Sequence, residues 1–226
     1  MSKQAEKKNA ALQAVTYVRS GMTLGLGTGS TAYFAIEAIG EQWKAGSLTD
    51  IRAIPTSEAT AQQASSYGIP LVELADVDRI DLTIDGADEF DPQLRLIKGG
   101  GGALFREKLV AFASDVMLVI SDASKEVPQL GAFPLPIEVL PKAVRLVQRV
   151  LTEKGYQPRL RTQEDGSPYQ TDNNNNILDC ALKRIPDPKR LDLELHLIPG
   201  IVETGLFLGL ASKIIMGRGE EVVEIG

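Results

Sequence analysis

The sequence has few of the residues that support redox, disulfide or metal chemistry. Its 226 residues include one cysteine, Cys180, and one histidine, His196. A lone cysteine excludes an internal disulfide, and no cysteine pair exists for a structural zinc site. No apolar run approaches the roughly 18 to 20 residues of a membrane span, and the first fifteen residues lack a signal-peptide apolar core. We therefore expect a cytoplasmic protein with no membrane partner.

Positive charge is also sparse. The chain carries 24 Lys and Arg against 30 Asp and Glu, a formal net charge of -6, and the cations are scattered along it. Binding to nucleic acid as a main function needs clustered cations that displace counterions, so we expect no nucleic-acid partner. The apolar fraction of 43% is ordinary for a globular protein, and the length suggests one or two domains.

Short apolar segments alternate with helical segments over the first 130 residues. Apolar segments at 22–27, 51–55, 80–85 and 116–121 each stand next to a longer segment with helical character. This alternation predicts an α/β fold in which a mostly parallel sheet is flanked by helices, a Rossmann-like arrangement. Ligands of such sheets gather at the carboxyl ends of the strands.

The pattern changes after residue 131, where Pro134, Pro136 and Pro141 interrupt the chain. A helix from about Lys142 to Lys154, strand-like pieces and a short helix after Pro188 follow, which predicts a smaller α+β (ferredoxin-like) subdomain. We expect residues 1–131 plus 208–226 to form the α/β catalytic domain, with the last two apolar segments returning to its sheet. Residues 132–207 would form the smaller subdomain, which we propose as an oligomer interface.

The segment GLGTGSTA, residues 25–32, stands where the first strand gives way to a helix. Outward-facing N–H groups, the positive end of the helix dipole and the hydroxyls of Ser30 and Thr31 suit a phosphate there. Ser30 replaces the third glycine of a dinucleotide-binding motif, and no phosphate-loop NTPase motif occurs in the chain. The alternative is a tight turn capped by Ser or Thr that binds no ligand.

An acidic segment, DGADEFD (residues 85–91), directly follows the apolar strand at 80–84. Asp-Gly is a common turn dipeptide, so a solvated acidic turn is the alternative interpretation. The position favours function, because a carboxylate at the carboxyl end of a buried parallel strand lies where ligands bind. Asp85, Asp88 and Asp91 could instead hold a hard cation.

The segment KGGGGALFREK, residues 98–108, contains four consecutive glycines, which are costly to order unless their missing side chains are used. Lys98 precedes the glycines and Glu107 follows on a predicted helix. A carboxylate base together with N–H donors placed where negative charge develops is the arrangement that moves a proton beside a carbonyl. The alternative is a helix start with an ordinary charged surface.

Three further residues are ambiguous by themselves. Lys125 stands at the carboxyl end of the strand at 116–121, and Lys7 lies in the first predicted helix. Either is also consistent with a surface lysine. His196 lies far from the three loops in sequence, and we expect it to pack or be solvated instead of taking part in catalysis.

Several segments in order along the chain resemble the ribose-5-phosphate isomerase family of the A type. They are GLGTGSTA, IPTSEAT, DGADE, KGGGGALFREK, SDASK, FPLPIEV, TDNNNNILD and IPGIVETGLF. The resemblance implies an isomerase that interconverts D-ribose 5-phosphate and D-ribulose 5-phosphate in the pentose phosphate pathway. It also implies no metal and no organic cofactor, a small-molecule sugar phosphate as the binding partner, and a homodimer or homotetramer.

Carried over by position, the resemblance assigns catalytic roles to Glu107, Asp85, Asp88 and Lys98. The residues that it assigns to substrate binding are Lys7, Thr28, Gly29, Ser30, Thr31, Asp85, Gly86, Ala87, Asp88, Lys98, Gly99, Gly100, Gly101 and Lys125. Sugar-phosphate sensor domains and CoA transferases share a similar first loop, so a non-catalytic sensor or a CoA-transferase-like protein is the alternative function. A metal-assisted hydride shift is the alternative mechanism.

Proton transfer through an enediolate would make Glu107 the base that takes the C2 proton and returns it to C1. Lys98 and the glycine amides would hold the oxyanion, and either Asp85 or Asp88 would move the hydroxyl proton or help to open the ring. Gly102 stands where many relatives are expected to have alanine, which should loosen the start of the helix by roughly 1 kcal/mol. Asn174 replaces a common glycine and should tolerate a left-handed turn.

Overall fold

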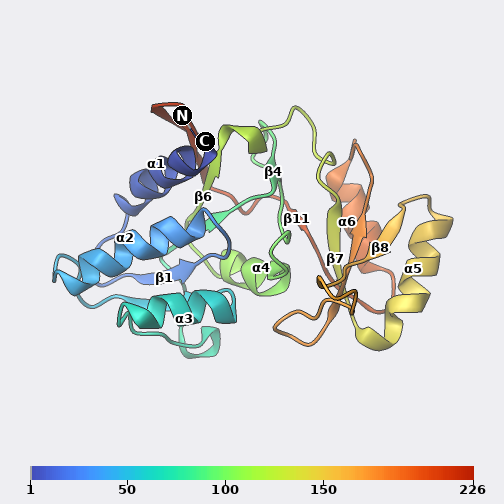
Figure 1. Ribbon diagram of the computed structural model, residues 1–226, viewed down its shortest axis with the longest axis horizontal. Coiled ribbons are helices and arrows are strands. Elements are labelled where there is room, and N and C mark those ends of the chain that lie inside the picture. Colours follow the sequence, from blue (N-terminus) through green and yellow to red (C-terminus); the bar gives the residue numbers. More distant parts are fainter. Residues whose placement is uncertain (1) are drawn as a thin grey trace. The chain divides into compact units, whose positions relative to one another are not determined.

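The computed structural model describes residues 2–226, and the contacts divide the chain into two compact units. The first unit comprises the chain up to Ala87 together with Arg106–Lys125 and Gly209–Gly226. The second comprises Asp88–Phe105 and Glu126–Leu208. Figure 1 shows the chain and labels elements of both units.

A mostly parallel sheet forms the centre of the first unit. Over residues 2–226 it has six strands in the order β13-β12-β6-β3-β1-β2. β13 runs antiparallel to β12, and the other neighbouring strands are parallel, so the predicted sheet and the return of the last two segments to it are confirmed. The strands are β1 (Thr23–Leu26), β2 (Arg52–Pro55), β3 (Leu82–Gly86), β6 (Met117–Asp122), β12 (Lys213–Arg218) and β13 (Glu221–Ile225).

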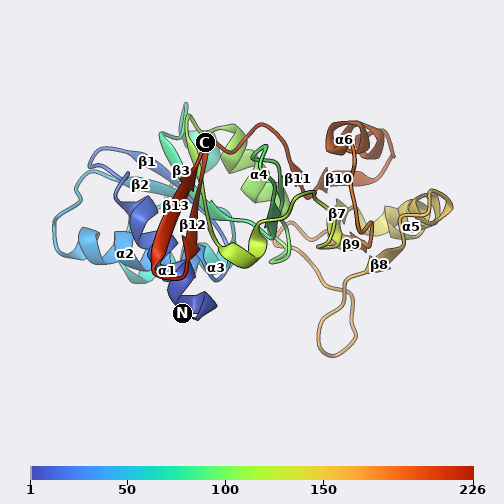
Figure 2. The ribbon, with the colours of Figure 1, turned by 90° about the horizontal axis from the view of Figure 1, so that it is seen from above.

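Helices cover both faces of this sheet (Figure 2). The main apolar cluster joins the sheet to α1 (Lys3–Val15), α2 (Ala32–Lys44) and α3 (Glu58–Ser66). A separate apolar cluster lies on the other face. It contains Val110 of α4 (Leu104–Phe112), Ile54 of β2 and Ile80, which precedes β3. The alternating strand and helix pattern of the sequence thus produces two layers of buried apolar side chains around one sheet.

Side-chain caps explain where two of these helices begin. The Ser2 hydroxyl accepts a hydrogen bond from the Ala5 amide at 3.3 Å, and α1 starts at the next residue. Ser57 accepts from the Thr60 amide at 3.1 Å in the same way at the start of α3. Such caps satisfy N–H groups that the first helical turn leaves without a partner.

The first helix lies against the last two strands at very short range. A Cβ atom on Gly217 of β12 would lie 2.1 Å from the carbonyl oxygen of Glu6 in α1, so only glycine fits at this position. The Glu6 carboxylate also accepts from the Gly219 amide at 2.8 Å. The two ends of the sequence are therefore packed backbone against backbone.

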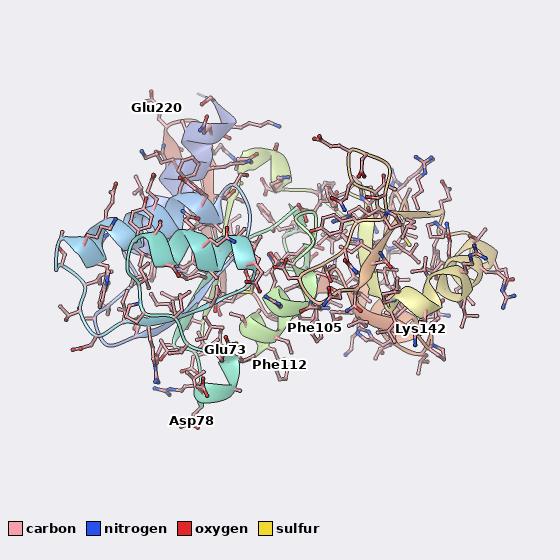
Figure 3. The ribbon with its side chains drawn as sticks, turned by 60° about the horizontal axis from the view of Figure 1, so that its bottom comes forward. Glu73, Asp78, Phe105, Phe112, Lys142 and Glu220 are labelled. Carbon is pink, nitrogen blue, oxygen red and sulfur yellow. The ribbon has the colours of Figure 1, made fainter. Side chains whose placement is uncertain are left out.

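The second unit has an antiparallel sheet covered by helices. In the described residues it has the order β10-β7-β9-β8, built from β7 (Leu135–Val139), β8 (Pro158–Leu160), β9 (Asn176–Cys180) and β10 (Ile201–Thr204). α5 (Val144–Glu153) and α6 (Pro188–His196) pack their apolar faces on it. Lys142, labelled in Figure 3, lies in the short turn Pro141–Ala143 that leads into α5. The predicted smaller α+β unit is thereby confirmed.

Three very short strands complete the second unit. β4 (Glu89–Phe90) pairs with β5 (Leu96–Ile97), which pairs with β11 (Leu206–Phe207). The boundaries predicted from the sequence assign residues 88–105 to the larger domain, whereas their contacts group them with the second unit through these pairings. No helix in residues 2–226 is long and apolar enough to span a membrane.

Candidate active site

The loop between β1 and α2 is lined by hydroxyl groups from a neighbouring strand end. Thr28 Oγ1 lies 2.7 Å from Thr56 Oγ1, 2.9 Å from Ser57 Oγ and 3.2 Å from Thr60 Oγ1. The Thr60 hydroxyl in turn donates to the Gly27 carbonyl at 2.8 Å. Since β1 and β2 are parallel neighbours, their carboxyl ends bring these side chains to the same edge of the sheet.

Asp85 holds this loop from the end of β3. Its side chain is fully buried, and Oδ1 accepts hydrogen bonds from the amides of Thr28 at 3.1 Å and Gly86 at 2.7 Å. A Cβ atom on Gly27 would lie 2.1 Å from the same oxygen, so the loop approaches the carboxylate as closely as glycine permits. The first residue of the predicted acidic segment is therefore hydrogen-bonded to the predicted phosphate loop.

Lys7 reaches the same loop from α1. Its Nζ donates to Ser30 Oγ at 2.9 Å and lies 3.9 Å from Oδ2 of Asp122, a buried residue at the end of β6. Lys125 ends the turn that follows β6. Lys7, whose role was ambiguous in the sequence, is thus a cation at the loop that we expect to bind phosphate.

A cavity of about 870 Å³ opens beside this loop. Its lining includes Lys3 and Lys7 of α1, Thr28 and Ser30 of the loop, and Gln63 of α3. Cavities of this size accommodate small-molecule ligands. Lys3, Lys7 and these hydroxyls could hold an anion on one part of its wall, while Tyr33, Phe34 and Ile36 make much of the rest apolar.

Glu107 lies in the first turn of α4 and is 4% exposed. Its neighbour Arg106 instead forms an ion pair with Glu58, with the two charged atoms 2.8 Å apart. The alternative of an ordinary charged helix surface therefore fits Arg106 and does not fit Glu107. A buried carboxylate near a helix N-terminus is a group that can hold and release a proton at a fixed place.

In the second unit, Asp88 and the glycine segment form a tight loop. The Gly100 amide donates to Asp88 Oδ2 at 2.7 Å, and the Gly102 amide donates to the Gly99 carbonyl at 3.0 Å. A Cβ atom on Gly100 would lie 2.5 Å from Asp88 Oδ1. The expectation that all the glycine amides face a ligand is therefore too broad, since two of them bind within the loop.

Lys98 is buried directly before these glycines. Only 2% of it is exposed, its Nζ lies 5.4 Å from the centre of the Phe207 ring, and its amide donates to the Gly205 carbonyl at 2.9 Å. A lysine is rarely buried to this degree unless its charge interacts with a partner group. Its burial sets it apart from the surface lysines of the chain.

Two expected departures from the family pattern can be compared with the structure. Gly102 has a φ of +84° and lies outside α4, which begins at Leu104, so the expectation that it loosens the helix is wrong. Its missing side chain matters for another reason, because a Cβ atom would lie 2.2 Å from the Tyr169 hydroxyl. Asn174 has a φ of +60°, and the expected left-handed turn is confirmed.

The remaining acidic residues of the segment 85–91 have structural partners. Asp91 accepts hydrogen bonds from the Arg95 side chain and from the Gln93 amide. Glu89 accepts from the amides of Gly131 and Phe133. Because Arg95 already neutralises Asp91, the geometry disfavours a cation held by Asp85, Asp88 and Asp91 together.

His196 lies beside two carboxylates in the second unit. Its Nε2 is 3.0 Å from Glu203 Oε1 and its Nδ1 is 3.5 Å from Asp192 Oδ1. Within residues 2–226, His196, Asp192 and Glu203 are the one group of three His, Cys, Asp or Glu side chains close enough to hold a metal ion together, with their possible ligand atoms all within 4.8 Å of one another. The expectation that His196 packs at the surface agrees with its place at the end of α6.

Sequence reasoning missed several residues that shape these loops. The hydroxyls of Thr56, Ser57 and Thr60 follow β2, and their position after a buried strand could have indicated them. Asp122 could have been found in the same way at the end of β6. Arg161 and Tyr169 contact the glycine segment, and no local signal indicates this because 60 or more residues separate the partners.

Comparisons with known proteins agree with one another. The profile of the family described as Ribose 5-phosphate isomerase A (phosphoriboisomerase A) matches residues 52–221. A ribose-5-phosphate isomerase A of Parvibaculum lavamentivorans is 50% identical over 99% of this chain and 100% of its own length.

Two solved structures are also similar. A D-ribose-5-phosphate isomerase in complex with phospho-erythronic acid has a TM-score of 0.96 and 39% identity, with 99% of each chain covered. Ribose 5-phosphate isomerase A from Methanocaldococcus jannaschii has a TM-score of 0.94 and 40% identity, again with 99% of each chain covered. None of these similarities favours a sensor domain or a CoA-transferase-like protein.

Proposed function

The chain belongs to the ribose 5-phosphate isomerase A family, and we propose that it interconverts D-ribose 5-phosphate and D-ribulose 5-phosphate with Glu107 as the proton-transferring base. It is an aldose-ketose isomerase of the non-oxidative pentose phosphate pathway. The observation that carries the assignment of the base is the buried carboxylate in the first turn of α4, directly after the glycine segment.

In the proposed reaction, Glu107 removes the proton from C2 of the open-chain aldose and returns it to C1. The electron pair passes to the carbonyl oxygen, so an enediolate with negative charge on oxygen lies between the two sugars. Lys98 and the amide of Gly101 would stabilise that oxygen, while the glutamic acid holds the proton. A positioned base of this kind contributes about 10² to 10⁴-fold, or about 3 to 5 kcal/mol.

The substrate phosphate would bind at the loop between β1 and α2. Lys7 supplies a positive charge there, and Thr28, Gly29, Ser30 and Thr31 supply hydroxyl and amide donors at the start of a helix. Lys125, in the short turn after β6, would be the second cation of this set. These groups bind the phosphate equally in both sugars and so contribute to affinity.

The two aspartates differ in their surroundings, and we assign them different tasks. Asp85 is fully buried and accepts hydrogen bonds from the amides of Thr28 and Gly86. This suits a residue that fixes the conformation of the loop after β1 and of its own neighbours Gly86 and Ala87. Asp88 is partly exposed and bound to the Gly100 amide, which suits a residue that moves the hydroxyl proton or opens the ring. Asp88→Asn should lower kcat on the ring-closed sugar more than on freshly generated open-chain substrate.

Glu107→Gln tests the assigned base. The amide keeps the shape of the side chain but cannot take a proton, so kcat should fall by about 10² to 10⁴-fold with little change in KM. Formation of the ketose from ribose 5-phosphate measures this, with exposed Glu153→Gln as the control. A Glu107→Gln enzyme that keeps a tenth of the wild-type kcat would rule out the assignment.

The proposed mechanism needs neither a metal nor an organic cofactor, and isotope incorporation tests this. In heavy water, a carboxylate that exchanges its proton between removal and return should leave deuterium on the product carbon. Added chelator should not change the rate. A metal-assisted hydride shift would give product without deuterium and a rate that falls with chelator.

We further propose a cytoplasmic homodimer or homotetramer in which the smaller unit supplies the interface. Leu193 of α6 and Leu197, which directly follows this helix, are four positions apart and are 62% and 82% exposed, as expected of apolar side chains that another subunit covers. The same unit also exposes Leu140 and Leu146. A second copy of the chain is the partner to which this proposal commits.

A further inference from the structure

Arg161, directly after β8, connects Asp179 of β9 to the main chain of the glycine segment. Its Nη1 donates to the carbonyl oxygens of Gly99 at 2.9 Å and Gly100 at 3.1 Å. Its Nε and Nη2 donate to the two carboxylate oxygens of Asp179 in β9 at 2.9 and 2.5 Å. One guanidinium thus binds a carboxylate with one edge and two consecutive peptide groups with another.

The two peptide groups are oriented by these bonds. In a trans peptide the C=O and the following N–H point in opposite directions. With the carbonyls of Gly99 and Gly100 directed at Arg161, the amides of Gly100 and Gly101 point to the opposite side. The Gly100 amide does so, since it donates to Asp88 on that side at 2.7 Å. Two successive amides that point the same way suit negatively charged oxygens; Asp88 supplies the oxygen for the Gly100 amide, and the Gly101 amide points beside it.

A tyrosine fixes the third carbonyl of the segment. The Tyr169 hydroxyl donates to the Gly101 carbonyl at 3.3 Å, and its ring lies 5.7 Å from the Arg161 guanidinium carbon. Burial raises the pKa of Tyr169 above its ordinary value, so the hydroxyl keeps the proton that it donates. Three consecutive carbonyls are therefore held by two side chains of the same unit.

We propose that Arg161 is a positioning residue for the isomerisation, which keeps the Gly100 amide on Asp88 and aims the Gly101 amide at the place where the enediolate oxygen becomes negative. This inference rests on the proposed function. Arg161 itself faces the carbonyl side of the loop and acts on the reaction through the amides. Asp179 keeps the guanidinium in place, and Tyr169 supports the adjoining peptide.

The geometry requires arginine and not simply a cation. Arginine presents a planar fork of donors, so it can bind both oxygens of Asp179 and still donate to two carbonyls. A lysine has one nitrogen on a flexible stem and cannot hold all four acceptors. Arg161→Lys should therefore keep the local charge but lose the orientation of the peptide groups.

Arg161→Gln, Arg161→Lys and the matched control Arg159→Gln test the proposal. Arg159 is an exposed residue two positions away in β8 that lies opposite Asp179 across the sheet, so its variant removes the same charge near the same carboxylate and leaves the Arg161 side chain in place. Both Arg161 variants should lower kcat by about 10 to 100-fold with KM changed less than threefold, on the scale of a misplaced oxyanion donor. Arg159→Gln should behave as the wild type.

Competitive inhibitors provide the measurement that a purely structural role would not reproduce. Phospho-erythronic acid carries a carboxylate at the reacting end of the molecule, whereas inorganic phosphate reports the phosphate loop alone. In Arg161→Gln, inhibition by the acid should weaken by about the same factor as kcat/KM falls, with inhibition by phosphate unchanged. Equal weakening of both inhibitors would overturn the proposal.

The outcomes separate this inference from the function on which it rests. A wild-type protein that forms no ketose would overturn the proposed function itself. If wild type and Glu107→Gln behave as proposed but Arg161→Lys and Arg161→Gln are as active as Arg159→Gln, only the inference fails. Should Arg161→Gln not fold, Arg161→Lys alone decides, because full activity in that variant contradicts a role for the fork geometry.

Discussion

At the scale of single residues, Gly100 shows how the lack of a side chain is used. The sequence alone indicates that the missing side chains of the four glycines are used, without showing what lies in their place. The structure gives a nearer cause, because a Cβ atom would lie 2.5 Å from Asp88 Oδ1 and would displace the carboxylate that the Gly100 amide binds. The glycine is therefore required by the loop itself.

Gly100→Val should lower kcat/KM by about 100-fold or more, because it moves Asp88 and tilts the neighbouring amides. The backbone at this position does not have a positive φ, so the protein should stay folded. Kinetics and the thermal midpoint measure the two effects separately. Normal turnover in a folded Gly100→Val enzyme would remove this account of the glycine segment.

A second prediction for a single residue concerns the reactivity of the Cys180 thiol. Burial, together with the nearby Asp179 carboxylate, raises the pKa of its thiol to about 12. The reactive thiolate is then scarce at neutral pH, and the Cys180 side chain has no exposed surface in the folded chain. A thiol reagent such as dithionitrobenzoate should leave the native protein unmodified and label one thiol per chain after unfolding in guanidinium. Rapid labelling of the native protein would contradict this.

At the scale of elements, Glu224 of β13 ties the last strands to α1. Its carboxylate accepts from Lys213 at 2.7 Å, from Gln13 at 2.9 Å and from Tyr17 at 2.7 Å. The hydrogen bond from Lys213, followed by those from Gln13 and Tyr17, lowers the pKa of Glu224 from its ordinary 4.5 to about 2. Because the folded-state pKa is lowered, this contact stabilises the fold above the ordinary value and is lost as pH falls toward 2.

Glu224→Gln should therefore be less stable than the wild type at pH 7, and the difference should shrink between about pH 4.5 and 2. Denaturant unfolding across this pH range measures it. Glu220→Gln, in the exposed turn between β12 and β13 that Figure 3 labels, is the control and should show no such convergence. A difference between Glu224→Gln and wild type that stays constant with pH would refute the argument.

Elements with strong periodicity could be predicted from the sequence, and those that depend on remote partners could not. The strands of the larger sheet and the helices α1, α2, α5 and α6 follow from apolar pattern and caps. β4, β5 and β11 are each two residues long and form only by pairing with one another, so no apolar pattern in their own sequence predicts them. The contacts of Arg161 could not be predicted for the same reason, because its partners are remote in sequence. Glu107 and Asp85 could be indicated, because a glycine segment or a strand end stands next to each of them in the sequence.

At the scale of the whole molecule, the exposed apolar side chains of α6 make a prediction about assembly. If the proposed interface is correct, Leu193→Glu combined with Leu197→Glu should give a monomer in light scattering where the wild type gives an oligomer, because charges would replace apolar side chains there. Phe112→Ser is the comparison, since Phe112 at the end of α4 is also 82% exposed (Figure 3). Dissociation by Phe112→Ser alone would place the interface on the larger unit instead.

The close packing of Gly217 against Glu6 also bears on synthesis of the protein. Lys7, one residue further along α1, contacts the phosphate loop, yet the surface on which α1 rests includes strands formed by the final residues of the chain. A nascent chain still lacking those residues would leave its first helix without that support. Catalytic competence should consequently arise only after β12 and β13 have been translated and have left the ribosome, although most of the loops proposed to bind the sugar are translated long before.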